Sequence, residues 1–279
     1  MTIHRKKRLL LVCLYCSVAL AATTWSAEPE RPLVVGHRGL LHAAPENTLA
    51  GFTACLELRV GFEFDVRRSK DGELVCLHDA TVDRTTNGKG PLAELLSKDV
   101  FRLDAGGWFG RRFRGERVPR VAEILSQIEK RGSEATLIAV DLKETGDGIE
   151  ESLIRLAERH HVLDRLVFIG ETIESNEVRG RLRAASPNAQ LARLAPAADK
   201  VGEVIDDRQA NWVYVRFLPS PESVGQVHRA GKRLFLAGPL VASEMRENWT
   251  QAAGLGIDAV LTDFPLELSR MLRESDGKH

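Results

Sequence analysis

The sequence has no excess of either charge, because 39 Lys and Arg residues face 39 Asp and Glu residues among 279. Proteins that bind nucleic acid carry a basic excess, so the composition gives no support for such a partner. Glycine and proline, at 23 and 11 residues, are too few for a collagen-like or low-complexity chain. The hydrophobic share of 43% is sufficient for a core and excludes an intrinsically disordered chain.

Motifs of several common enzyme classes are also missing. The chain contains no G-x-S-x-G, H-E-x-x-H, Walker A or G-x-G-x-x-G sequence. Its chemistry therefore has to come from side chains arranged in another pattern.

Residues 1–27 have the composition of a secretory signal peptide. Basic residues from Arg5 to Arg8 precede an apolar run from Leu9 to Ala22. This run is shorter than the roughly 20 apolar residues that span a bilayer. Cleavage after Ala27 would leave a mature chain without a membrane anchor. We therefore expect an exported protein, either periplasmic or secreted, with an uncleaved anchor helix as the alternative.

Only two cysteines, Cys55 and Cys76, follow this segment. Export to an oxidising compartment makes a disulfide conceivable. Each cysteine lies in an apolar stretch, however, which favours two small buried side chains over a bridge.

Short apolar runs alternate with amphipathic stretches between residues 33 and 273. In the stretch 121–130, for example, apolar residues recur at the spacing of one helix face. Repeated strand–helix units over about 250 residues predict an α/β fold, and their number favours a TIM-type (β/α)8 barrel over an open doubly wound sheet. Nine strands are expected, at 33–36, 61–66, 73–77, 136–142, 166–169, 190–194, 212–217, 233–237 and 259–262.

Two stretches depart from this alternation. The third strand follows the second after a turn at Asp71 and Gly72, which is too short for a helical crossover, so we expect an antiparallel hairpin or a strand that leaves the barrel wall. The glycine-rich segment 80–118 is long for a strand–helix connection. We interpret it as a small insertion over the barrel mouth, with Trp108 and Phe109 either covering that mouth or packed within the loop.

Acidic side chains gather at the expected carboxyl ends of the strands, where barrel enzymes have their active sites. Glu63 and Asp65 are two residues apart on one strand and therefore point to one face, while Phe62 and Phe64 point to the other. Asp141 lies at the end of another strand and can add a third carboxylate. Carboxylates inside a barrel repel one another, which a divalent cation relieves, and oxygen ligands favour Mg²⁺ or Ca²⁺ over Zn²⁺. A solvated strand face is the alternative interpretation of the acidic pair.

Basic side chains occupy the same ends. We expect Arg38 and Lys143 to be unpaired cations in the cavity, and together with a metal they would form a site for phosphate. His37 and His78 are candidates for a general base and a general acid, since imidazole titrates near neutral pH. A structural or surface role is the alternative for each histidine taken singly.

These motifs, in this order, resemble the glycerophosphodiester phosphodiesterase family. The similarity extends over residues 33–273 and rests on His37-Arg38-Gly39, Pro45-Glu46-Asn47-Thr48, Glu63-x-Asp65, His78-Asp79 and Thr262-Asp263-Phe264-Pro265. Taken by itself, the second of these motifs is a helix-capping signature with Asn or Thr at the cap, and we assign it a structural role.

The resemblance implies hydrolysis of small-molecule glycerophosphodiesters to glycerol 3-phosphate and an alcohol, with Mg²⁺ or Ca²⁺ as cofactor. It implies that the substrate's own glycerol hydroxyl attacks first and that water then opens a cyclic phosphate. It also implies a role for six residues. Glu63 and Asp65 would bind the metal, His37 and His78 would be the base and the acid, and Arg38 and Lys143 would bind the phosphate.

The chain departs from the family pattern at two places. The usual E-x-K motif is Asp141-Leu142-Lys143 here, and a Trp-Thr motif on the penultimate strand is missing from 234–239. The metal and the substrate preference are therefore open. A lysophospholipase D-type activity, a glycoside hydrolase and a catalytically degenerate phosphate-ester binding protein are the alternative functions.

Overall fold

A closed barrel forms the centre of the protein in a computed structural model that describes residues 31–133, 136–146 and 148–276. The ring closes because β1 (Leu33–Gly36) pairs in parallel with both β2 (Gly61–Arg68) and β9 (Ala259–Thr262). The other parallel strands of the ring are β4 (Ile138–Leu142), β5 (Leu166–Ile169), β6 (Gln190–Ala195), β7 (Trp212–Val215) and β8 (Arg233–Leu236). The predicted TIM-type barrel is confirmed.

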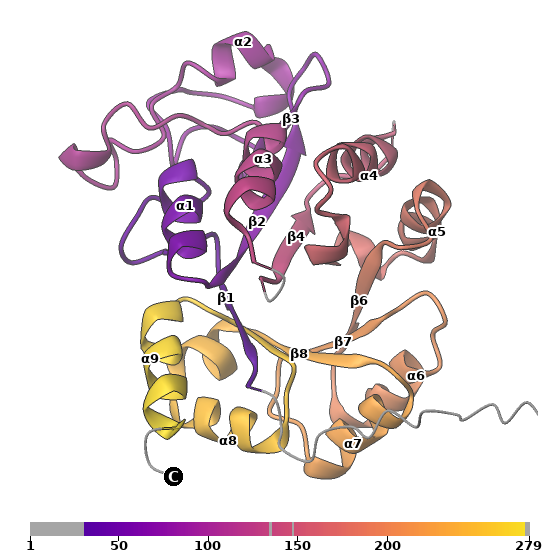
Figure 1. Ribbon diagram of the computed structural model, residues 1–279. Coiled ribbons are helices and arrows are strands. Elements are labelled where there is room, and N and C mark those ends of the chain that lie inside the picture. The colour runs from indigo at the N-terminus through magenta and orange to yellow at the C-terminus, as the bar shows by residue number, and fades with distance from the viewer. Residues whose placement is uncertain (1–30, 134–135, 147, 277–279) are drawn as a thin grey trace, which may run out of the picture.

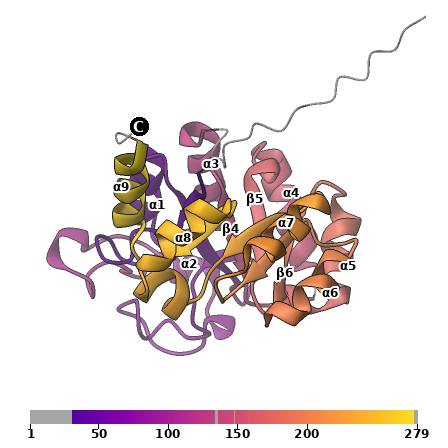
Figure 2. The ribbon, with the colours of Figure 1, turned by 90° about the horizontal axis from the view of Figure 1, so that it is seen from below.

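Helices cover the outside of the barrel (Figures 1 and 2). The half in indigo to salmon carries α1 (Leu49–Glu57), α3 (Val121–Arg131), α4 (Ile149–Arg159) and α5 (Asn176–Ala185). The orange and yellow half carries α6 (Val201–Ile205), α7 (Pro221–Arg229), α8 (Glu247–Leu255) and α9 (Pro265–Asp276). Short helical turns in the connections are η1 (Leu92–Glu94), η2 (Arg111–Phe113), η3 (Leu163–Arg165), η4 (Thr172–Glu174), η5 (Ala198–Lys200) and η6 (Pro239–Glu244).

The two faces of β2 divide as its alternating sequence predicts. Phe62, Phe64 and Val66 are buried outside the barrel among residues of α1, α3 and α4, and Phe62 stacks on Phe52 at 4.3 Å between ring centroids. The barrel interior is filled by a separate apolar cluster that includes Ala139 of β4. Since Asp141 is two residues further along β4, it shares this inward face. The polar residues of the strand ends therefore stand above an apolar floor.

The irregular stretch after β2 is a hairpin, as expected. Strand β3 (Leu74–Cys76) runs antiparallel to the end of β2, with Val66 opposite Cys76, and stands outside the closed ring. Segment 80–118 follows with the short helix α2 (Ser97–Val100) and lies beside β3 in Figure 1. It has its own small core, made by Val75, Leu77, Val82, Leu92, Val100, Phe101, Ala105 and Val118.

The aromatic pair of this insertion makes contacts within it, although Trp108 is 44% exposed. The Trp108 indole N–H donates to the Ala105 carbonyl at 2.8 Å, and its ring meets Phe109 edge-on at 5.7 Å. That the insertion covers the barrel mouth stays a prediction.

The strand ends predicted from the sequence agree with the structure to within two residues. Cys55 and Cys76 are both buried and both free, as their apolar surroundings indicated.

The proposed signal peptide, residues 1–27, lies outside the described residues. Within the described part of the chain, no helix is both long enough and apolar enough to cross a membrane. Export and the state of the amino terminus stay predictions.

Candidate active site

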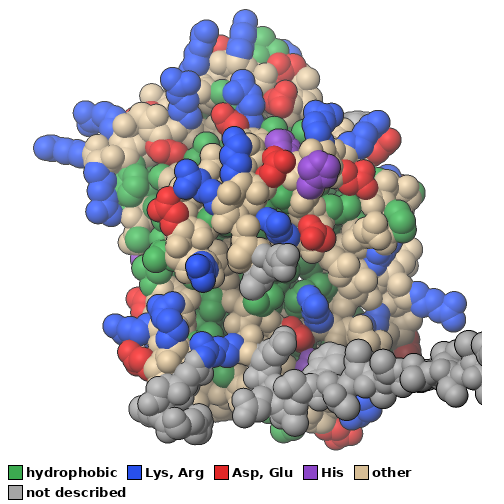
Figure 3. Space-filling model, in the orientation of Figure 1, with side chains coloured by type: hydrophobic (Ala, Val, Ile, Leu, Met, Phe, Trp, Pro, Cys, Tyr) green, Lys and Arg blue, Asp and Glu red, His purple; other side chains and the backbone are tan. Residues whose placement is uncertain are grey.

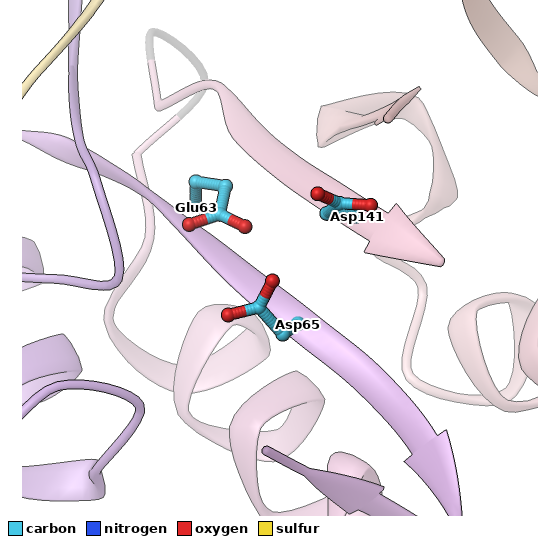
Figure 4. Close-up of side chains that lie close together, drawn as sticks. All are labelled: Glu63, Asp65 and Asp141. Carbon is cyan, nitrogen blue, oxygen red and sulfur yellow. The ribbon is translucent and has the colours of Figure 1, made fainter. Parts of the chain in front are cut away.

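Three carboxylates meet at the carboxyl ends of β2 and β4, as the sequence predicted. Asp65 and Asp141 are opposite each other in the register of the two strands. Glu63 is two residues before Asp65 and therefore on the same face of β2. One oxygen of each of the three side chains lies within 4.8 Å of the others. Figure 4 shows the carboxylates facing one another in the space between the strands.

The surroundings of the three acids shift their pKa values in different directions. Burial, and then the charges of Asp65 and Asp141, raise the pKa of Glu63 well above its usual value. Burial likewise raises the pKa of Asp141. Burial acts in the same direction on Asp65, but the nearby charges of Lys143 and Arg38 outweigh it and lower the pKa of this carboxyl group. The neighbouring positive charges therefore do not offset the effect of burial at Glu63 and Asp141.

This donor set fits a hard divalent cation. Its ligand atoms are carboxylate oxygens, the donors that Mg²⁺ and Ca²⁺ prefer, and Glu63 and Asp65 are 2% and 1% exposed. The Lys143 ammonium, 3.0 Å from an oxygen of Asp65 and 2.5 Å from one of Asp141, shows that the cluster attracts positive charge. Among the residues that the structure describes, Glu63, Asp65 and Asp141 can hold such an ion.

The expectation that Arg38 and Lys143 are unpaired was wrong. Arg38 lies 3.0 Å from Glu46 and 3.5 Å from Asp65, and Lys143 bridges two of the clustered carboxylates. The physical reason is that both cations are largely buried, where an unpaired charge is expensive. Both still line the cavity at the strand ends, so their place in the site is as predicted.

Each histidine is held by a carboxylate. Nδ1 of His37 lies 2.7 Å from Asp263, and Nδ1 of His78 lies 2.7 Å from Asp79. Since an ionised carboxylate only accepts, Nδ1 carries the hydrogen, and in the neutral ring Nε2 is left as an acceptor. Both rings line the same cavity as Glu63. The arrangement can take a proton at one histidine and deliver one at the other.

The motif Pro45-Glu46-Asn47-Thr48 does more than cap a helix. Thr48 caps α1 by accepting from the Gly51 amide at 3.4 Å, which the sequence indicated. Asn47, however, donates to Asp65 at 2.6 Å and accepts from the Asp65 amide at 3.2 Å. Asn47 therefore fixes the carboxylate of Asp65, a role that its place in the connection from β1 to α1, at the mouth of the barrel, could have suggested.

Glu46 joins the site to the insertion. It accepts two hydrogen bonds from Arg84, at 2.7 and 2.8 Å, and one from Arg38 at 3.0 Å. Arg84 also binds Asp79, the partner of His78, at 2.6 Å. This chain of ion pairs, which sequence reasoning missed, connects Arg38 with His78 through Glu46, Arg84 and Asp79.

Two residues of the site have left-handed backbone conformations. Arg38 has φ 53° and Asn47 has φ 55°, in a region where residues other than glycine are uncommon. The Arg38 amide thereby donates to Glu63 at 2.9 Å, and the Asn47 amide donates to the Arg38 carbonyl at 3.1 Å. Such strain costs on the order of 1 kcal/mol per residue. At Arg38 it directs a backbone donor to the Glu63 carboxylate, and at Asn47 it accompanies a backbone hydrogen bond back to Arg38.

The site opens into two connected spaces. A cavity of about 250 Å³ lies inside the barrel mouth, between the histidines, Glu63 and Tyr214. A groove of about 870 Å³ continues from it over the ends of β4 and β5. Five residues line both the cavity and the groove and so form the boundary between them: His78, Asp141, Lys143, Gly170 and Arg216.

Gly170 offers a way to disturb the cluster without removing a ligand. Its φ is +103°, and a Cβ there would lie 2.0 Å from an oxygen of Asp141. We expect Gly170→Ala to displace Asp141 and to weaken Mg²⁺ or Ca²⁺ binding about 10- to 100-fold, the range seen when the support of a ligand is lost. Titration calorimetry with each ion measures this effect.

The matched control is Gly72→Ala, since Gly72 has φ +87° and nothing within 4 Å of the added Cβ. Both variants introduce similar backbone strain, but only the first contacts a proposed ligand. Equal metal affinity in the two variants would show that Asp141 does not bind the ion.

Comparison with known proteins agrees with this geometry. The model of the glycerophosphoryl diester phosphodiesterase family matches residues 37–267. A glycerophosphodiester phosphodiesterase of Caldanaerobacter subterraneus subsp. tengcongensis is 30% identical, over 88% of this chain and 99% of its own length. The crystal structure of a glycerophosphodiester phosphodiesterase from Agrobacterium tumefaciens has 27% identity and a TM-score of 0.71, covering 84% of this chain and 97% of that one.

A barrel whose mouth combines buried carboxylates, cations and two oriented histidines is suited to an enzyme that acts on phosphate esters. The match over most of the chain makes the class more specific. The chain belongs to the glycerophosphoryl diester phosphodiesterase family.

Proposed function

We propose that the protein is an exported, metal-dependent phosphodiesterase that hydrolyses glycerophosphodiesters to glycerol 3-phosphate and an alcohol. The observation that carries this proposal is the carboxylate cluster of Glu63, Asp65 and Asp141, whose oxygens lie within 4.8 Å of one another beside two oriented histidines. The relative from Caldanaerobacter, which matches nearly end to end, bears the name of this activity.

The histidines have distinct roles in this proposal. His37 is the general base that takes the proton of the attacking hydroxyl at Nε2, with Asp263 holding its other nitrogen. His78 is the general acid that protonates the departing alcohol, with Asp79 holding its ring. The phosphate lies between them, bound by Arg38 and Lys143.

The attacking group is a glycerol hydroxyl of the substrate itself. Two hydroxyl side chains are among the described residues that line the cavity, Ser243 and Tyr214. The hydroxyl of Ser243 accepts from the Asp263 amide at 3.0 Å and makes no hydrogen bond to either histidine, and burial raises the pKa of Tyr214 to about 12. Without an activated protein nucleophile, the substrate oxygen attacks phosphorus, the alcohol leaves with a proton, and water then opens the cyclic phosphate. A divalent cation in the carboxylate cluster would supply positive charge for the oxygens of the reacting groups.

The groove beside the cavity favours water-soluble diesters over lysolipids. Apart from Leu142 and Val178, its side chains are mostly polar or charged, including Arg67, Arg181 and Glu177. An acyl chain needs an apolar groove, so a lysophospholipase D-type activity has less support. A degenerate binding protein also has less support, because Asp141 does lie in the carboxylate cluster.

A substrate panel tests this function. With Mg²⁺ or Ca²⁺ present, we expect release of glycerol 3-phosphate from glycerophosphoglycerol, glycerophosphoethanolamine and glycerophosphocholine. We expect slower turnover of lysophosphatidylcholine, because most side chains that line the groove are polar or charged and suit an acyl chain poorly. Coupled assay of glycerol 3-phosphate gives the rates. Rates that rise with acyl-chain length would favour the lysolipid activity, and tight binding without any turnover would favour a binding protein.

The export part of the proposal rests on the basic and apolar pattern of residues 1–27. Expression of the full chain in a bacterium, followed by fractionation and determination of the amino terminus, tests it. A shortened chain outside the cytoplasm supports export, and an intact chain in the cytoplasmic fraction contradicts it.

A further inference from the structure

An anionic substrate has to be attracted locally in this protein. The formal charges of the chain cancel, and on the face shown in Figure 3 acidic and basic side chains are interspersed. The field of the whole molecule therefore adds little to the binding of a phosphodiester. The cations at the barrel mouth, and how far each is already neutralised, decide how phosphate is bound.

The cations assigned to phosphate are already engaged by carboxylates. Arg38 faces Glu46 and Asp65, and Lys143 faces Asp65 and Asp141. Part of their charge is therefore offset before a substrate arrives. In the groove, Arg67 lies 3.3 Å from Glu144 and is offset in the same way.

Arg216 differs from these cations, because it has no ion-pair partner among the residues that the structure describes. It follows β7 directly and lies two residues after the inward-facing Tyr214, so the strand geometry directs it to the same interior side. Its guanidinium carbon is 5.8 Å from the centroid of the Tyr214 ring. The side chain is exposed, and it lines both the catalytic cavity and the groove.

The backbone beside Arg216 leaves space for its side chain. Gly238, after β8, has φ +98°, and a Cβ there would lie 3.2 Å from the Cβ and 3.4 Å from the Cγ of Arg216. A larger residue at 238 would crowd the stem of the arginine. The connection after β8 thus accommodates a long cation at the boundary of the two spaces.

We propose that Arg216 is a third phosphate-binding residue, which contacts the phosphodiester where the substrate passes from the cavity into the groove. The proposal rests on the function proposed above and adds a ligand on the side of the barrel opposite β2. A guanidinium offers two parallel N–H donors to phosphate oxygens, and one without a competing carboxylate binds with its full charge. Negative charge on those oxygens grows during the reaction, so the contact strengthens in the transition state.

Kinetics of Arg216→Ala test this assignment. A hydrogen bond to a charged group is worth enough that we expect kcat/KM on glycerophosphoglycerol to fall about 10- to 100-fold. The inhibition constant of glycerol 3-phosphate rises in the same variant, since the product carries the same phosphate. Arg216→Lys keeps the positive charge but loses the paired N–H donors of the guanidinium. We expect its kcat/KM to lie between those of the wild type and the alanine variant.

The matched control is Arg208→Ala, which removes an exposed arginine shortly before the start of β7, at the opposite end of the same strand. Equal values of kcat/KM and of the inhibition constant of glycerol 3-phosphate in the Arg216→Ala and Arg208→Ala variants would overturn the proposal. A wild type that hydrolyses no glycerophosphodiester, while its affinity for glycerol 3-phosphate still depends on Arg216, would refute the proposed function and leave the phosphate-binding role of Arg216 supported.

Discussion

Replacing either His37 or His78 by alanine lowers kcat on a glycerophosphodiester by about 100- to 10,000-fold, the usual contribution of a positioned acid or base. Each ring has one nitrogen 2.7 Å from a carboxylate and lines the catalytic cavity. Alanine removes the proton carrier but leaves the carboxylate cluster in place. The rates are measured with saturating substrate and metal, and thermal unfolding verifies that each variant is folded.

The two variants separate when the leaving group is changed. From a p-nitrophenyl ester of glycerol phosphate, the p-nitrophenolate group leaves without being protonated. This substrate therefore restores much of the rate of the His78→Ala variant if His78 is the acid. It gives no comparable rescue of His37→Ala, because a base is still required. The reverse pattern would exchange the two assignments. His160→Ala is the matched control, since His160 also pairs with a carboxylate, Glu129 at 2.9 Å, but lies outside both spaces of the site.

Glu63→Gln has opposite effects on activity and on stability. The variant loses one of three clustered carboxylates, so we expect metal affinity to fall at least about 10- to 100-fold and activity to fall with it. The metal-free protein becomes more stable, since burial and two neighbouring carboxylates raise the pKa of Glu63 and so make its ionised form unfavourable. A gain of about 1 kcal/mol corresponds to a rise of about 2–4 °C in Tm for a chain of this size.

Glu150→Gln is the matched control, for which we expect a change of Tm in the opposite direction. Glu150 is also buried, but it is not in the cluster and lies 2.6 Å from Arg181. Burial opposes its ionisation, yet the hydrogen bond from Arg181 prevails and lowers the pKa of this carboxyl group. We therefore expect Glu150→Gln to lower Tm and to leave the metal response intact. A fall of Tm in both variants would mean that the charges of the cluster do not repel as described.

The sequence was sufficient for the barrel because local signals repeat along it. Each strand is a short apolar run, and the spacing of Glu63 and Asp65 alone places both carboxylates on one face of β2. The end of a parallel strand in a barrel then locates them at the mouth, beside Asp141 of β4.

The pairing of charges could not be predicted in the same way. Arg84 reaches Glu46 across 38 residues, and His37 reaches Asp263 across 226, so neither contact leaves a periodic signal in the chain. Treating Arg38 as unpaired failed for a different reason, because its partner Glu46 is near in sequence but stands in a motif that also caps a helix. The left-handed backbone of Arg38 was also hidden, since arginine has no preference for that conformation.

Removal of divalent cations is the direct test of metal dependence in this protein. The purified mature protein is treated with EDTA, the chelator is removed, and hydrolysis of glycerophosphocholine is measured before and after addition of Mg²⁺ or Ca²⁺. We predict loss of activity on chelation and recovery with at least one ion, because Glu63, Asp65 and Asp141 form an oxygen site for a hard cation. Full activity in the treated, metal-free protein would contradict it.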